Sequence, residues 1–133
     1  MNKGTLKINP FSGLIMVDIK IWNKNKSKLD RLPITVDTGA SVTTISTDIL
    51  FQAGYDVTSG RVVRITTASG IEYVKEVYVE KMRLDTIDLD NVLVYAHTFP
   101  QESFSTGVLG LNVLTGFDVN FQFSKGLIDL TKI

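Results

Sequence analysis

The chain has 133 residues, with 14 Lys plus Arg, 14 Asp plus Glu and one His, so its formal net charge at pH 7 is zero. This length suits one domain over residues 1–133, and the balanced charge favours neither nucleic acid nor an anionic membrane as a partner. The absence of cysteine excludes disulfides, cysteine nucleophiles and thiolate metal sites.

The chain shows no targeting segment. Its N-terminal stretch, residues 1–20, contains no long apolar core followed by a small-residue cleavage site. No apolar run approaches the roughly 20 residues that a membrane-spanning helix needs. We therefore expect a cytoplasmic protein without a signal peptide or a transmembrane segment.

The first predicted elements form a hairpin. Residues 13–22 (GLIMVDIKIW) are apolar and β-branched, and a polar turn, NKNKSKLD, separates them from RLPITVD. Strand, solvated turn and strand in this order are typical of a β-hairpin. Pro33 in the second arm suits the first residue of a strand or an edge position.

The next predicted element is a short helix over residues 46–56 (STDILFQAGYD). Ser46 or Thr47 is a suitable N-cap, Asp48 lies in the first turn and Gly54 can end the helix. The long segment that follows, residues 60–84, predicts a hairpin with its tip at Ser69-Gly70, half buried and projecting from the body.

The C-terminal half continues this pattern. We expect a strand over Val92–Ala96, an irregular loop with Pro100, a short helical piece near Leu111–Leu114 and two strands around residues 124–126. Many short strands joined by Gly and Asn turns favour an all-β fold, a small closed β-barrel with one or two short helices.

One acid stands out in this pattern. Asp37 directly follows an apolar strand and is followed by Thr38, Gly39 and Ala40. A strand that ends in an Asx-type turn explains such a sequence without any function. An unpaired carboxylate is costly to bury, however, so a partner or a chemical purpose is the alternative explanation.

The chemical explanation needs a second carboxylate. Two carboxyl groups that share one proton hydrolyse an amide, one activating water and the other donating a proton. The chain contains a single Asp-Thr-Gly, so the second acid would be Asp37 of another copy, related by a two-fold axis. This chemistry implies a homodimer and requires no metal and no organic cofactor.

Three segments in order resemble the retropepsin-like aspartic proteases, the single-domain dimeric form of the pepsin-like fold. ITVDTGASVTTIS resembles the catalytic strand and loop, RITTASGIEYV the flap hairpin, and GVLGLNVLTGFDVNF the apolar-apolar-glycine element before a short helix. The resemblance extends from Leu14 to Leu130. It implies a barrel with a flap hairpin and an endopeptidase that cuts extended peptide or protein substrates.

The resemblance also implies roles for individual residues. Asp37 would be the catalytic acid, Thr38 would tie the two catalytic loops together, and Gly39 and Ala40 would complete the active-site loop. Val108 would line a substrate subsite, and Gly110 would permit close packing beneath the loop. The flap tip would comprise Thr67, Ala68, Ser69 and Gly70, and the terminal segments would contribute to an intersubunit sheet.

Two positions differ from many viral members, which carry a paired Asp and Arg where this chain has Ser41 and Leu111. In both respects the chain resembles bacterial and cellular relatives more closely. The acidic stretch Asp85–Asn91 is expected to be a solvated turn rather than a calcium site, and His97 is expected to have a structural or loop role.

Two other functions remain open. The chain could be a dimerisation or peptide-binding module without proteolysis, although such a module would not need an acid at a dimer axis. It could also be a self-processing protease domain cut from a longer precursor.

Overall fold

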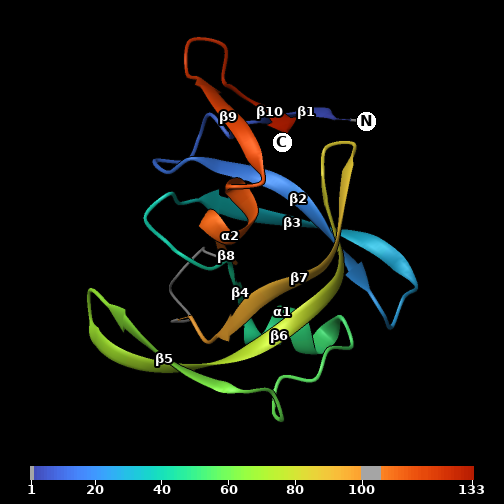
Figure 1. Cartoon of the computed structure of the whole chain (residues 1–133), viewed down its shortest axis with the longest axis vertical. Helices are drawn as coiled ribbons and strands as arrows, with labels where there is room; N and C mark the ends of the chain where they lie inside the picture. Colours follow the sequence, from blue (N-terminus) through green and yellow to red (C-terminus); the bar gives the residue numbers. More distant parts are fainter. Residues whose placement is uncertain (1, 100–105) are drawn as a thin grey trace.

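The computed structural model describes residues 2–99 and 106–133. Within these ranges the elements follow in the order β1 (Lys3–Lys7), β2 (Met16–Asn23), β3 (Lys28–Val36), β4 (Thr44–Ser46), α1 (Thr47–Gln52), β5 (Val62–Thr67), β6 (Gly70–Leu84), β7 (Ile87–His97), β8 (Gly107–Leu109), α2 (Leu111–Leu114), β9 (Phe117–Gln122) and β10 (Leu127–Lys132). Figure 1 shows their arrangement. The expected loop at Pro100 lies outside the described residues.

Six strands form a closed barrel, as the sequence predicted. Their order is β2-β3-β8-β4-β7-β6, and a short pairing between β2 and β6 closes the ring at Lys20↔Arg83 and Ile21↔Met82. Strand β5 pairs only with β6 and extends beyond the ring as a hairpin. Because β2 pairs with β6, neither strand leaves a free edge at this point, and this protects both strands from pairing with other chains.

Alternation of apolar residues explains how the barrel is filled. Along β2, Asp18 and Lys20 are exposed. Their neighbours Val17, Ile19 and Ile21 are buried and point inward. The same period of two appears in the other barrel strands and places β-branched side chains in the interior. The most deeply buried side chains of the barrel include the β-branched Ile19, Ile21, Ile34, Ile45, Val79 and Val94, together with Met82 and Leu109.

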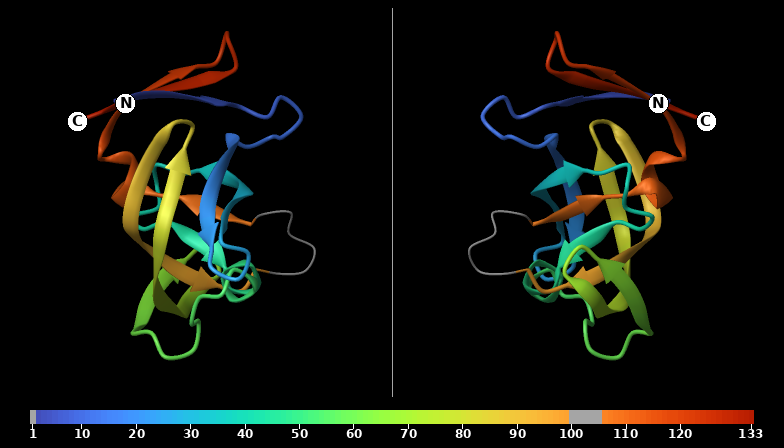
Figure 2. Two further views of the ribbon diagram at one scale, coloured as in Figure 1. Left: turned by 90° about the vertical axis from the view of Figure 1, so that its right-hand side faces the viewer. Right: turned by 90° about the vertical axis from the view of Figure 1, so that its left-hand side faces the viewer.

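A separate three-stranded sheet carries both ends of the chain. Its order is β1-β10-β9, and all its pairs are antiparallel. Leu6, Ile128 and Leu130 are buried and belong to the main hydrophobic core, so one face of this sheet packs on the barrel. Figure 2 shows the sheet capping one end of the barrel, with N and C lying close together.

Several local predictions need correction. Strand β7 begins at Ile87, so the acidic stretch is largely strand, and its turn is confined to Asp85 and Thr86. Asp88 is not a solvated turn residue, because Arg83 holds its carboxylate at 2.5 Å. The Arg83 guanidinium also lowers the pKa of Asp88.

Helix α1 is close to its predicted position but is not capped as the sequence suggests. Ser46 occupies the N-cap, yet its side chain makes no capping hydrogen bond. Gly54 follows the helix with a positive φ of 90°, which agrees with its predicted role in ending it. Neither helix in the described ranges has the length and apolar character that a transmembrane helix needs.

Pro33 lies in the middle of β3 and not at its start. It pairs with Asp18 of β2 on one side, while pairing with β8 on the other side begins only at Thr35. At Pro33 the strand is therefore a local edge, and the missing N–H of proline costs no ladder hydrogen bond.

Candidate active site

Strand β3 delivers Asp37 to the end of the barrel. The Asp37 amide donates to the Leu109 carbonyl at 3.0 Å, which continues the β3–β8 ladder beyond the Val36↔Leu109 pair. Carboxylate atom Oδ1 accepts a hydrogen bond from the Gly39 amide at 2.8 Å. Within the described residues this carboxylate accepts no other hydrogen bond, so Oδ2 is available to water or to a second carboxyl group.

The residues after Asp37 form an open loop that is held from beneath. The Leu111 amide donates to the Ala40 carbonyl at 2.8 Å, and the Asn112 amide donates to the Ser41 carbonyl at 3.1 Å. Thr38 and Gly39 are exposed on the opposite side of the loop. The outer face of the loop is therefore accessible to a substrate or to another chain.

Gly110 packs directly against this loop. A Cβ atom at this position would lie 2.8 Å from the Ala40 carbonyl oxygen, 2.8 Å from the Val42 carbonyl carbon and 2.9 Å from the Thr43 nitrogen. The φ of Gly110 is −102°, an angle that any residue can adopt. The site needs glycine here because the loop backbone leaves no space for a side chain.

Thr43 and Asn112 connect the loop to α2 and β7. Asn112 Oδ1 accepts from the Thr43 amide at 2.8 Å and from the Thr43 hydroxyl at 2.9 Å, and Asn112 Nδ2 donates to the Leu93 carbonyl at 2.8 Å. The Thr43 hydroxyl in turn accepts from the Gly110 amide at 3.0 Å. Thr43 is fully buried, so its polar groups depend on these partners.

We expect Asn112→Ala to lower the free energy of unfolding by about 1–3 kcal/mol, because it leaves buried polar groups of Thr43 without a partner. Chemical denaturation measures this loss. Asn112→Asp is the matched control, because it keeps an acceptor for Thr43 and loses only the donor to Leu93. Equal stability of Asn112→Ala and the wild type would contradict this role of Asn112.

The projecting hairpin of β5 and β6 lies on the same side of the barrel as the loop after β3 (Figure 1, Figure 2). Its turn is Ala68-Ser69, flanked by the Thr67↔Gly70 pair, so the tip is one residue earlier than the sequence suggested. The Thr67 hydroxyl donates to the Gly70 carbonyl at 3.1 Å, and the Ser69 amide donates to that hydroxyl at 3.2 Å. The positive φ of Gly70, 118°, explains the glycine.

Val108 lies on the same face of the sheet as Asp37. It pairs with Thr35 of β3 and with Thr44 of β4. Paired residues point to one face, and Thr35 precedes Asp37 by two residues along an extended chain. Val108 is half-buried on this face. It is therefore available to contact a group that lies against Asp37.

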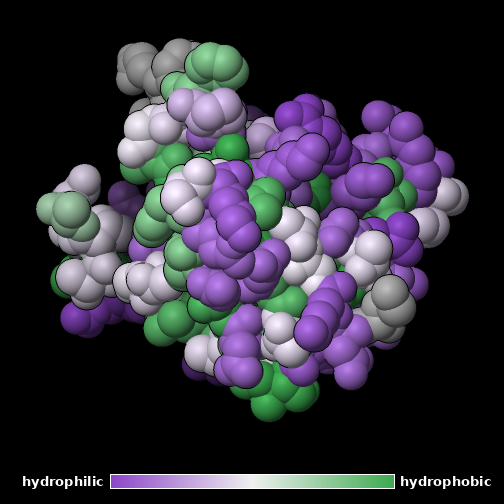
Figure 3. Space-filling view, turned by 90° about the horizontal axis from the view of Figure 1, so that it is seen from above, coloured by the Kyte–Doolittle hydropathy of each residue, from purple (hydrophilic) through white to green (hydrophobic). Residues whose placement is uncertain are grey.

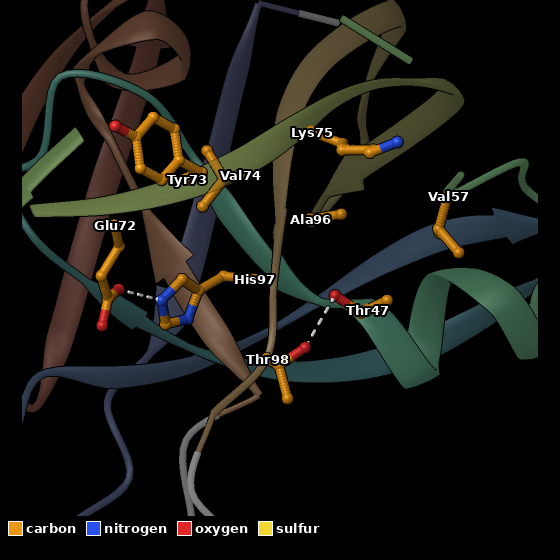
Figure 4. Close-up of a pocket in the computed structure, with 9 residues that line it drawn as sticks. All are labelled: Thr47, Val57, Glu72, Tyr73, Val74, Lys75, Ala96, His97 and Thr98. Atoms are coloured by element: carbon orange, nitrogen blue, oxygen red, sulfur yellow. Dashed lines mark hydrogen bonds and ion pairs between the residues drawn. The ribbon is translucent and has the colours of Figure 1, made fainter. Parts of the chain in front are cut away.

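A groove of about 520 Å³ lies between the base of the hairpin, α1 and the end of β7 (Figure 4). It is lined by residues of several elements, namely Thr47, Val57, Glu72, Tyr73, Val74, Lys75, Ala96, His97 and Thr98. His97 and Glu72 are in contact in this groove. Sequence reasoning missed this pair, because 25 residues separate its members and no local pattern connects them.

The described residues contain no cluster of three or more His, Cys, Asp or Glu side chains arranged to hold a metal ion. The carboxylate of Asp85 instead accepts the Thr5 amide at 2.8 Å, and that of Asp88 bonds to Arg83. Each of these acids thus has a partner within the protein.

Comparison with known proteins shows similarity to one family and to solved structures. The family described as "gag-polyprotein putative aspartyl protease" matches residues 28–116. A retropepsin-like aspartic protease from Rickettsia conorii has a similar structure, with a TM-score of 0.65 and 16% identity, over 98% of this chain and 89% of that chain. No curated protein sequence matches the chain.

Proposed function

Because the chain belongs to the retropepsin-like aspartic protease family and is an aspartic endopeptidase, we propose that it works as a homodimer with a catalytic pair of Asp37 carboxyls, one from each protomer. The observation that carries this proposal is the isolated Asp37 carboxylate at the end of β3, with Gly39 as its partner. We further propose that one protease domain spans residues 1–133.

The reaction needs the two carboxyls in different protonation states. Two carboxyl groups in contact cannot both be ionised readily, because their negative charges repel. The pair therefore shares one proton. The ionised Asp37 takes a proton from water as the water oxygen attacks the peptide carbonyl carbon, and the protonated Asp37 gives its proton to the carbonyl oxygen. When the tetrahedral intermediate collapses, the Asp37 that took the water proton gives it to the nitrogen and the C–N bond breaks. A hydroxyl proton of the intermediate returns to the other Asp37 as the new carboxyl group forms.

The exposed side of the loop supports contact with a second chain. Thr38 is exposed, and within the described residues its side chain makes no hydrogen bond in its own protomer. We propose that Thr38 joins the two loops across the two-fold axis. Gly39 would then offer its backbone to an extended substrate, since glycine permits close approach.

The terminal sheet supplies a second contact between protomers. Strands β1 and β9 each pair only with β10, so both outer edges of the sheet offer free backbone groups. Phe123, directly after the edge strand β9, and Ile133, directly after the central strand β10, are exposed. Figure 3, which looks onto this end, shows hydrophilic and hydrophobic groups interspersed. We therefore propose an interface that combines strand pairing with scattered apolar contacts.

The hairpin and Val108 would hold the substrate. The hairpin tip at Thr67–Gly70 would close over an extended peptide and exclude water, while Val108 would contact a side chain next to the cleaved bond. Ser41 and Leu111 carry no charge and cannot form an ion pair. The loop is held from below by the hydrogen bonds between Thr43 and Asn112 instead.

Digestion of a diverse peptide library, read by mass spectrometry, tests this function. The wild type is expected to cut within peptides, and Asp37→Ala to leave the library intact. Equal digestion by both proteins would contradict a catalytic role for Asp37. A dimer that binds peptides without cutting them would instead support the binding-module alternative.

A further inference from the structure

The outer half of the β5–β6 hairpin has little backbone support from the barrel. Pairing between β6 and β7 begins at Lys75↔Ala96, so residues 70–74 of β6 pair only with β5. Strand β5 has no other neighbour. The position of residues 62–74 relative to the barrel therefore depends on the continuity of β6 beyond Lys75 and on side-chain contacts.

One polar contact connects this outer half to the barrel. The carboxylate of Glu72 contacts Nε2 of His97, the last residue of β7 (Figure 4). A carboxylate only accepts hydrogen bonds, so Nε2 carries the hydrogen and donates it. Within the described residues this is the one side-chain hydrogen bond or ion pair between residues 62–74 and the rest of the chain.

The two partners differ in how firmly they are held. His97 pairs with Ser46 of β4, and its ring lies edge-on to Phe99 at 4.8 Å between centroids. Its side chain is 18% exposed, whereas that of Glu72 is 37% exposed. His97 is thus the partner carried by the barrel, and Glu72 is the more exposed partner carried by the hairpin.

The surroundings make this contact stronger than an ordinary surface ion pair. Fully exposed pairs contribute little, since water and salt screen them. Here both side chains are more than half buried, and His97 Nδ1 is buried without a hydrogen-bond partner among the described residues. Glu72 is therefore the group that satisfies the imidazole, and its loss would leave both ring nitrogens unpaired.

We propose that Glu72 and His97 are a positioning pair that holds the β5–β6 hairpin in place over the substrate. This inference rests on the proposed protease function, in which the hairpin closes over the substrate. In the free enzyme the pair keeps the hairpin close to its closed position. Less of the substrate's binding free energy is then needed to order the hairpin. Neither residue contacts the reacting atoms.

The first test is a kinetic comparison on a peptide that the wild type cuts. We expect Glu72→Ala to lower kcat/KM by about 5- to 30-fold, the range for losing a partly buried charge-assisted hydrogen bond. We expect this loss as a higher KM with little change in kcat, because bound substrate closes the hairpin in both the variant and the wild type. Glu76→Ala is the matched control, since Glu76 lies on the same strand face and makes no side-chain hydrogen bond in the described chain.

The second test does not require activity. Hydrogen exchange of the amides in residues 62–74 should accelerate in Glu72→Ala by a factor similar to the kinetic loss, both in the active protein and with Asp37→Asn. Amides of β1 and β10 should be unchanged. If the wild type cuts no peptide, the proposed protease function is wrong. The exchange measurement then still decides whether Glu72 holds residues 62–74 against the barrel.

Exchanging the two residues tests the pair directly. Glu72→His combined with His97→Glu should restore kcat/KM to within about threefold of the wild type, because the same contact can form in reverse. Three results would each overturn the proposal: unchanged exchange in Glu72→Ala, a double variant as impaired as the single one, or a loss confined to kcat. An equal effect of Glu76→Ala would overturn it as well.

Discussion

Asp37→Asn is expected to lower kcat/KM by about 10³-fold or more, because a dimer with two amides has neither a general base nor a general acid. Asn has almost the same shape as Asp, and its side-chain oxygen can still accept the Gly39 amide. Folding should therefore be unaffected. Steady-state kinetics on a peptide from the library digest measures the loss.

The control for this variant is an exposed acid elsewhere in the chain. Asp48 lies in the first turn of α1, and Asp48→Asn should keep wild-type kinetics. Circular dichroism and solution mass of Asp37→Asn should match those of the wild type. Retained cleavage by a folded Asp37→Asn protein would show that another group carries the chemistry.

Gly110→Ala is expected to damage both the stability and the activity of the protein. The new methyl group would lie within 3.0 Å of three backbone atoms of the active-site loop, namely those of Ala40, Val42 and Thr43. Overpacking of this kind costs about 1–3 kcal/mol of stability. Because the loop must shift, we also expect kcat/KM to fall by about 100-fold, the loss that a displacement of about 1 Å can cause.

Gly13→Ala separates this effect from the general consequences of replacing glycine. No atom lies within 4 Å of a Cβ built on Gly13. Its substitution should therefore leave activity unchanged and stability equal or slightly higher. Urea denaturation and kinetics of both variants test the prediction, and similar behaviour of the two would refute the packing argument.

Much of the barrel was predictable because its signals are local. Alternating β-branched residues mark β2 and β3, and Gly70 marks the hairpin turn with a backbone angle that other residues avoid. The turn after β3 was predictable for a similar reason, since Asp37 and Gly39 interrupt an apolar run with residue types that a buried strand does not need.

What the sequence could not reveal depends on long-range register. Strand β1 is formed by pairing with β10, which lies more than 120 residues later, and no local pattern specifies such a partner. The same holds for Asn112 with Thr43 and for His97 with Glu72. In each case a polar side chain acquires its role only when the fold brings a distant residue to it.

An active site formed by Asp37 from two chains requires both carboxyls, and mixing wild-type protein with Asp37→Asn tests this requirement. The two proteins are refolded together in equal amounts, so that protomers combine at random. If the carboxyls act as a pair, only the dimers with two wild-type chains are active, and activity per total protein falls to about one quarter of the wild-type value. Activity of about one half would mean that each chain works alone, and would contradict the shared site.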